Sequence, residues 1–131
     1  MLIYLRCRGS WVGSHILADP ELEGYVTSLS GPHPSITIEE RLFSRSSEEL
    51  VARVRKPVLL LPCENDPDTY RVGGAIHNLL TQNVKEDFVV VDMPTVKHGF
   101  TVRGDISIPE VHRCVKVALD AILNFIKAHD N

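Results

Sequence analysis

The chain is expected to fold as a three-layer α/β domain around a small, mainly parallel sheet. Three observations predict this class. Strand-like and helix-like segments alternate along the chain, which is the order of parallel sheets covered by helices. Residues 57–61 are apolar throughout, as in a strand covered on both faces. The length of 131 residues allows one domain with a substantial core, so residues 1–131 are interpreted as a single unit.

The first half of the chain carries two predicted strands and two predicted helices. Residues 2–5 are a short apolar run of β-forming residues, and residues 24–29 read as a second strand. Between them, apolar residues at helical spacing predict a helix over residues 9–18. Ser46 to Glu49 match a capping box, which predicts the start of a short helix before the apolar strand.

The segment after the apolar strand predicts a helix with a weak point. Asp68 and Thr69 can cap this helix, and Val72 and Ile76 lie on its apolar face. The pair Gly73-Gly74 costs roughly 1 kcal/mol per glycine relative to alanine. A break or a close approach is therefore expected at the two glycines.

The remaining third predicts a strand, a long loop and a final helix. Residues 87–93 read as another buried strand, and residues 93–107 show no clear period. A loop of this length in a compact domain is more often functional than idle. Pro109 begins the last helix, whose apolar stripe is spaced for docking on a sheet: Val111, Val115, Ala118, Ile122 and Phe125.

Composition excludes several classes of function. The net charge of −3 disfavours a nucleic-acid binder that neutralises phosphates. No apolar run approaches the ~20 residues of a membrane span, so no membrane partner is expected. An odd, sparse set of three cysteines predicts no disulfide framework, and no cysteine or histidine spacing is typical of zinc. With no signal-peptide pattern, a cytoplasmic location is expected.

A thiol, a carboxylate and an imidazole follow three of the predicted strands. Cys7 follows the first strand, Asp66 the third and His98 the fourth. Ligands bind at the carboxyl ends of parallel strands, so these side chains are expected at one sheet edge. Their order along the chain, nucleophile then acid then base, is that of α/β-hydrolase triads. A helix beginning directly after Cys7 would also favour its thiolate.

Four stretches carry a resemblance to a known family. They are residues 7–10 (CRGS), residues 33–35 (HPS), the acid loop 64–68 (ENDPD) and residues 98–105 (HGFTVRGD), of which the last is the most specific. Together they resemble dienelactone hydrolases. The resemblance covers nearly all of this chain but only the carboxyl-terminal half of the family's domain. It therefore implies a partial α/β-hydrolase fold.

The resemblance also implies an activity and a role for each site residue. Cys7 would be the nucleophile, Asp66 the orienting acid and His98 the base. Arg103 matches an arginine that helps some members hold an acidic substrate, and the backbone N–H of Arg8 would donate to the oxyanion. The implied reaction is hydrolysis of a small ester or lactone, with no metal or organic cofactor.

Two departures from the family pattern favour an alternative, a non-catalytic hydrolase-like remnant or truncated product that acts as an interaction module. Leu5 stands two residues before Cys7, where the sharp turn of the family has glycine. The family's second oxyanion donor follows an early strand that has no counterpart here, and losing one donor costs about 10²–10³ in rate. An uncovered edge at residues 2–5 further predicts a homodimer or a partner chain over the first strand.

Overall fold

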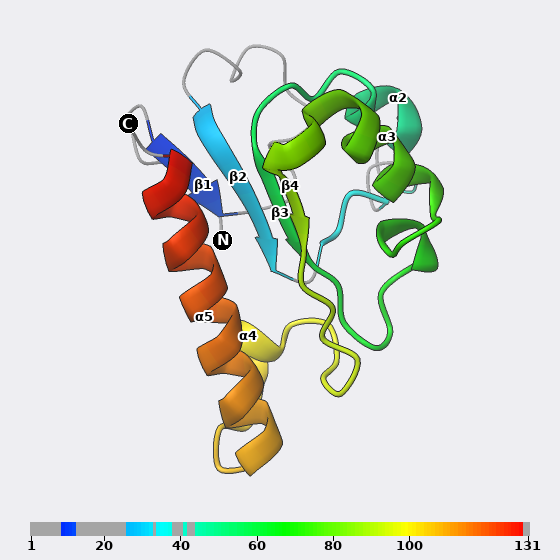
Figure 1. Ribbon diagram of the computed structural model, residues 1–131. Coiled ribbons are helices and arrows are strands. Elements are labelled where there is room, and N and C mark those ends of the chain that lie inside the picture. The colour runs from blue at the N-terminus through cyan, green and yellow to red at the C-terminus, as the bar shows by residue number, and fades with distance from the viewer. Residues whose placement is uncertain (1–8, 13–25, 33, 38–40, 42–43, 130–131) are drawn as a thin grey trace.

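The computed structural model describes residues 9–12, 26–32, 34–37, 41 and 44–129. Within them, four strands form one parallel sheet in the order β1-β2-β3-β4 (Figure 1). The strands are β1 (Gly9–Val12), β2 (Val26–Pro32), β3 (Val58–Leu61) and β4 (Phe88–Val90). The helices are α2 (Ser47–Val51), α3 (Ala75–Val84), α4 (Phe100–Arg103) and α5 (Pro109–His129).

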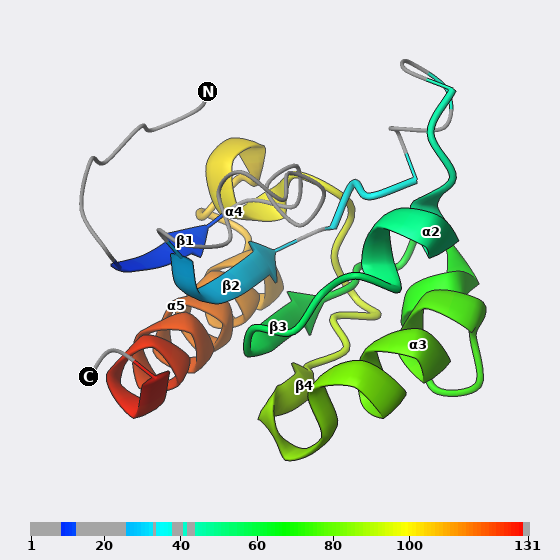
Figure 2. The ribbon, with the colours of Figure 1, turned by 90° about the horizontal axis from the view of Figure 1, so that it is seen from above.

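Helices cover the sheet on both faces, so the domain has three layers (Figure 2). Val58 and Leu60 of β3 belong to the core shared with α2 and α3, whereas Leu59 and Leu61 belong to the core shared with α5. All four side chains are at most 1% exposed. The predicted α/β class is confirmed, and so is the prediction that the apolar strand is covered on both faces.

Side chains hold the beginnings of the two helices on one face of the sheet. The hydroxyl of Ser46 accepts a hydrogen bond from the backbone N–H of Glu49 at 3.3 Å, as the capping box predicts. The hydroxyl of Thr69 accepts from the backbone N–H of Ile76 at 3.1 Å. Thr69 thus satisfies one of the free N–H groups at the start of α3, although it lies several residues upstream.

The predicted break at Gly73-Gly74 is confirmed. A 3₁₀ turn at Asp68–Tyr70 precedes the glycines, and α3 begins only at Ala75. Val72 lies in this break and is 87% exposed, so its assignment to the apolar face of the helix is wrong. Because α3 begins only after Val72, the helical spacing of the apolar residues does not apply to this side chain, and it stays outside the core.

The final helix packs its predicted stripe on the sheet. Ala118, Ile122 and Phe125 are buried with Cys114, while Val111 and Val115 pack partly buried against the same core. None of the helices in the described ranges is both long and apolar enough to cross a membrane.

The predicted helix over residues 9–18 is wrong where the structure describes it, because Gly9–Val12 form β1. The backbone of this segment pairs with β2 in parallel, and Trp11 and Val12 are residue types that favour strands. The apolar spacing that predicted a helix relied on residues 13–18, which lie outside the described residues, as does the predicted strand at residues 2–5. The helix N-terminus expected to favour the Cys7 thiolate is therefore not formed by residues 9–12.

The predicted strand over residues 87–93 is shorter and less buried than expected. β4 spans Phe88–Val90, and Val89 is 39% exposed. Among the described strands β4 stands last in the sheet and pairs with β3 alone. An apolar run indicates a strand but not how completely the faces of that strand are covered. The edge position of β4 explains why its side chains are less buried than the sequence predicts.

Candidate active site

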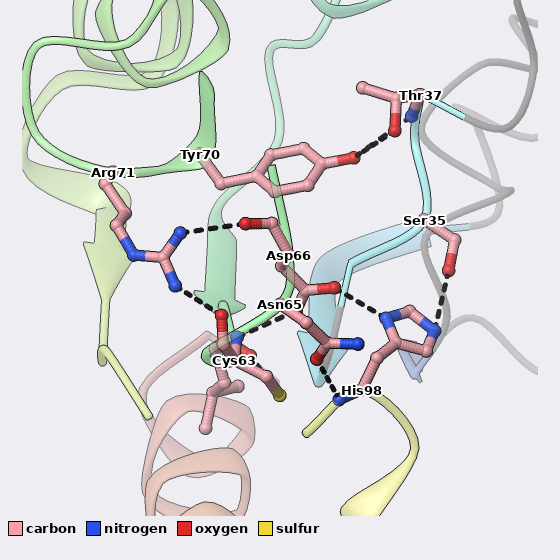
Figure 3. Close-up of polar contacts among 9 residues, drawn as sticks. Ser35, Thr37, Cys63, Asn65, Asp66, Tyr70, Arg71 and His98 are labelled. Carbon is pink, nitrogen blue, oxygen red and sulfur yellow. Dashed lines mark hydrogen bonds and ion pairs between the residues drawn. The ribbon is translucent and has the colours of Figure 1, made fainter. Parts of the chain in front are cut away.

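Three loops leave the carboxyl ends of neighbouring strands and bring Ser35, Asp66 and His98 together (Figure 3). Ser35 follows β2, Asp66 follows β3 and His98 follows β4. The last two loops are held side by side beyond the strands themselves. Cys63 forms a parallel bridge with Met93, and further backbone hydrogen bonds continue along the two loops.

A buried carboxylate and a partly exposed imidazole form the centre of the site. Oδ1 of Asp66 lies 2.6 Å from Nδ1 of His98. Only 3% of the Asp66 side chain is exposed, against 31% for His98. The second carboxylate oxygen accepts the backbone N–H of Cys63 at 2.7 Å. Both carboxylate oxygens therefore have a partner, and this fixed carboxylate orients the imidazole.

His98 is fixed by contacts on two further sides. Its backbone N–H donates to Oδ1 of Asn65 at 2.7 Å, and its Nε2 lies 3.3 Å from the Ser35 hydroxyl. The carboxylate of Asp66 assigns the proton of the neutral ring to Nδ1, so that Nε2 becomes the acceptor. In this tautomer the Ser35 hydroxyl donates to Nε2, and Nε2 is the atom able to take a proton.

Arg71 clamps the acid loop from the side opposite His98 (Figure 3). Its guanidinium donates to the backbone oxygen of Asp66 at 2.9 Å and to that of Cys63. It also pairs with Asp92, at 3.3 Å, and with Asp68, at 3.2 Å. The loop that carries Asp66 is thereby tied to the segment that follows β4.

The loop that carries Ser35 is anchored by a buried tyrosine. Tyr70 is fully buried, and its hydroxyl accepts the backbone N–H of Thr37 at 3.0 Å and donates to the Thr37 hydroxyl at 3.3 Å. Burial raises the pKa of Tyr70 above its ordinary value, so the hydroxyl remains a donor at neutral pH.

His98 and Arg103 line two adjacent hollows. One, of about 470 Å³, also has Ser35, Arg41 and Asn65 in its wall. The other, of about 290 Å³, extends towards α4 and α5. The structure thus places the predicted substrate-binding residue Arg103 beside the predicted base. A carbonyl compound in the larger hollow would meet an imidazole, a hydroxyl and two guanidinium groups.

Gly99 makes room for the Arg103 guanidinium. Its φ of +90° lies in the left-handed region, and a Cβ at this position would lie 2.5 Å from a guanidinium nitrogen of Arg103. Gly73 has the same φ but no atom within 4 Å of such a Cβ. A substitution at Gly73 therefore introduces backbone strain alone, whereas the same substitution at Gly99 also crowds Arg103.

Gly99→Ala is expected to destabilise the fold more than Gly73→Ala does. The left-handed backbone costs each alanine about 1–2 kcal/mol, and only Gly99→Ala must also displace Arg103. Urea unfolding measures the difference between the two variants, which should disappear in an Arg103→Ala background. Equal losses for the two variants in the wild-type background would contradict the expected difference and would mean that the flexible Arg103 side chain moves aside at no measurable cost.

The predicted nucleophile Cys7 and the predicted oxyanion donor Arg8 lie outside the described residues. Asp66 and His98 are brought together, and Arg103 lies next to them. Sequence reasoning assigned no role to Ser35 or Arg71. Ser35 lies in the loop after the strand that ends at Pro32, so the rule that pointed to Asp66 and His98 was a signal for it too.

Cys63 lies next to the acid loop, but its side chain belongs to the hydrophobic core. Its side chain is fully buried. Burial, followed by the negative charge of Asp66, raises the pKa of the Cys63 thiol to about 12. Because the thiol stays protonated below that pH, Cys63 is unable to act as a thiolate nucleophile near neutrality.

Iodoacetamide at pH 8 is accordingly expected to leave Cys63 unmodified in the folded chain. The same treatment in urea should modify it, because unfolding removes the burial that suppresses the thiolate. Peptide mass spectrometry measures both results. Rapid alkylation of Cys63 in the folded chain would contradict its buried, protonated state.

No family model, no curated protein and no solved structure matches this chain. The resemblance to dienelactone hydrolases therefore rests on the four sequence stretches that carry it.

Proposed function

We propose that the chain hydrolyses small esters or lactones, with Cys7 as the nucleophile, His98 as the general base and Asp66 as the orienting acid. The observation that supports this most strongly is the 2.6 Å contact between Asp66 Oδ1 and His98 Nδ1. This contact holds the imidazole so that Nε2, the nitrogen that would accept a proton, points away from Asp66 and towards Ser35. A base oriented by a buried carboxylate is the arrangement that acyl transfer requires.

The proposed reaction has two steps. His98 Nε2 takes the proton of the Cys7 thiol, and the thiolate attacks the substrate carbonyl carbon. The imidazolium, stabilised by Asp66, then protonates the leaving alcohol, and water hydrolyses the resulting thioester. Arg103 is proposed to hold an acidic group of the substrate. The roles of Cys7 and of the Arg8 backbone N–H come from the family resemblance.

Steady-state hydrolysis of p-nitrophenyl acetate and of a small enol lactone tests this proposal. The wild-type chain is expected to turn over at least one of them, and Cys7→Ala is expected to slow turnover about 10²-fold or more. Cys114→Ala is the control, because Cys114 is a buried residue of α5 that lines neither of the hollows beside His98. A wild-type chain that hydrolyses neither substrate above the buffer rate would exclude the proposed activity.

One observation favours the second candidate, a non-catalytic interaction module. The nucleophile elbow is a strand-to-helix turn, whereas Gly9–Val12, which follow Cys7 closely, form β1. β1 stands first in the order of the described strands, where a second copy or another chain can add to the sheet. A dimer by sedimentation combined with absent turnover would select this candidate over the hydrolase.

A further inference from the structure

The described residues contain a complete hydroxyl–imidazole–carboxylate array. Ser35 Oγ lies 3.3 Å from Nε2 of His98, whose Nδ1 lies 2.6 Å from Asp66. Serine, acid and base follow β2, β3 and β4 in that order, so three adjacent strands of one sheet supply them. The distance to Nε2 is slightly longer than in an assembled transition state, as is common before a substrate binds.

The hydroxyl is held in place as a nucleophile needs to be. Pro34 and Ile36 on either side of Ser35 are buried, and Thr37 is tied to the buried Tyr70 by two hydrogen bonds. Ser35 itself is only partly buried and lines the hollow of about 470 Å³. A substrate there can therefore approach Ser35 while the surrounding backbone remains fixed.

We propose that Ser35 is a second acyl acceptor, which with His98 and Asp66 forms a serine-based esterase centre that works without Cys7. This inference rests on the proposed function, because both nucleophiles use the same base and the same acid. Its substrates are the same small esters and lactones.

The chemistry balances without a cofactor. Nε2 of His98 takes the hydroxyl proton as Ser35 Oγ bonds to the carbonyl carbon. The carbon–oxygen bond to the leaving alcohol then breaks, and the imidazolium returns its proton to that oxygen. Water, activated by His98, cleaves the acyl-serine ester and releases the acid. The guanidinium groups of Arg41 and Arg103 line the same hollow and supply positive charge for the oxyanion.

The test uses the full chain carrying Cys7→Ala, treated with a fluorophosphonate that forms a stable adduct with activated serines. Fragmentation of the modified peptide is expected to place the adduct on Ser35. Adding Ser35→Ala or His98→Ala should slow labelling about 10³-fold or more, whereas adding Ser107→Ala, an exposed serine, should leave it unchanged. A melting curve for each variant separates loss of labelling from loss of the fold.

The outcomes distinguish this inference from the proposed function. If the wild-type chain hydrolyses p-nitrophenyl acetate but Cys7→Ala is neither labelled on Ser35 nor active, Ser35 is not an acyl acceptor and the cysteine hydrolase stands. If the wild-type chain is inactive and unlabelled, both proposals fail. If Cys7→Ala keeps an activity that Ser35→Ala then removes, the serine centre is established.

Discussion

Replacing His98 with alanine is expected to lower kcat and kcat/KM together by about 10³-fold or more. In both proposals His98 is the base, and no other described imidazole lies against Asp66 to replace it. Asp66 would lose its imidazole partner but keep the backbone N–H of Cys63, which lies 2.7 Å from its second oxygen. The carboxylate therefore retains a donor, and the loss is expected in turnover rather than in folding.

The matched control is His112→Ala, which removes an exposed imidazole from α5 and is expected to leave turnover unchanged. Steady-state kinetics with p-nitrophenyl acetate and a melting curve for each variant separate the chemical role from the structural one. Wild-type turnover in the His98→Ala variant would remove the base from the proposed mechanism.

The pairing of acid and base could be predicted from the sequence because it depends on topology. Asp66 and His98 are 32 residues apart, yet each lies in the loop that follows a strand, and β3 and β4 are neighbours in the sheet. Parallel strands place their carboxyl ends at one edge, so their following loops meet there whatever the loops contain. Apolar runs and alternation were sufficient evidence for those strands.

Contacts that depend on how a loop folds back could not be predicted in this way. Arg71 reaches the carbonyl oxygens of Cys63 and Asp66 because a 3₁₀ turn reverses the chain after the acid loop. Neither periodicity nor composition reports that reversal. Ser35 was obscured for a different reason. It too follows a strand, but the resemblance assigned the role of nucleophile to Cys7, so Ser35 received no role.

The error over Gly9–Val12 has a physical cause as well. A short segment with apolar residues at mixed spacing fits a helix and a strand about equally well, and sheet pairing decides between them. Here pairing with β2 favours the strand. The consequence is chemical, because a thiolate next to a helix N-terminus and one next to a strand have different electrostatic surroundings.

The Asp66→Asn variant is expected to fold normally and to lose about 10⁴-fold in kcat, because it reverses the imidazole tautomer. The amide oxygen of asparagine can still accept the Cys63 N–H, so the turn of the acid loop is preserved. Its NH₂ group then faces Nδ1 of His98, which must become the acceptor. The proton moves to Nε2, the atom that has to accept a proton from the nucleophile, and the base is blocked.

Asp68→Asn is the control for this variant, because Asp68 lies in the same region, pairs with Arg71 and has a fully exposed side chain. Its turnover is expected to match the wild type. The tautomer itself is observable through the ¹⁵N chemical shifts of the His98 ring, which should show the proton on Nδ1 in the wild-type chain and on Nε2 in Asp66→Asn. An Asp66→Asn variant with wild-type turnover would mean that the 2.6 Å contact only holds the loops together. A shifted tautomer with lost turnover would assign the orienting role to Asp66 by a measurement that a purely structural contact does not affect.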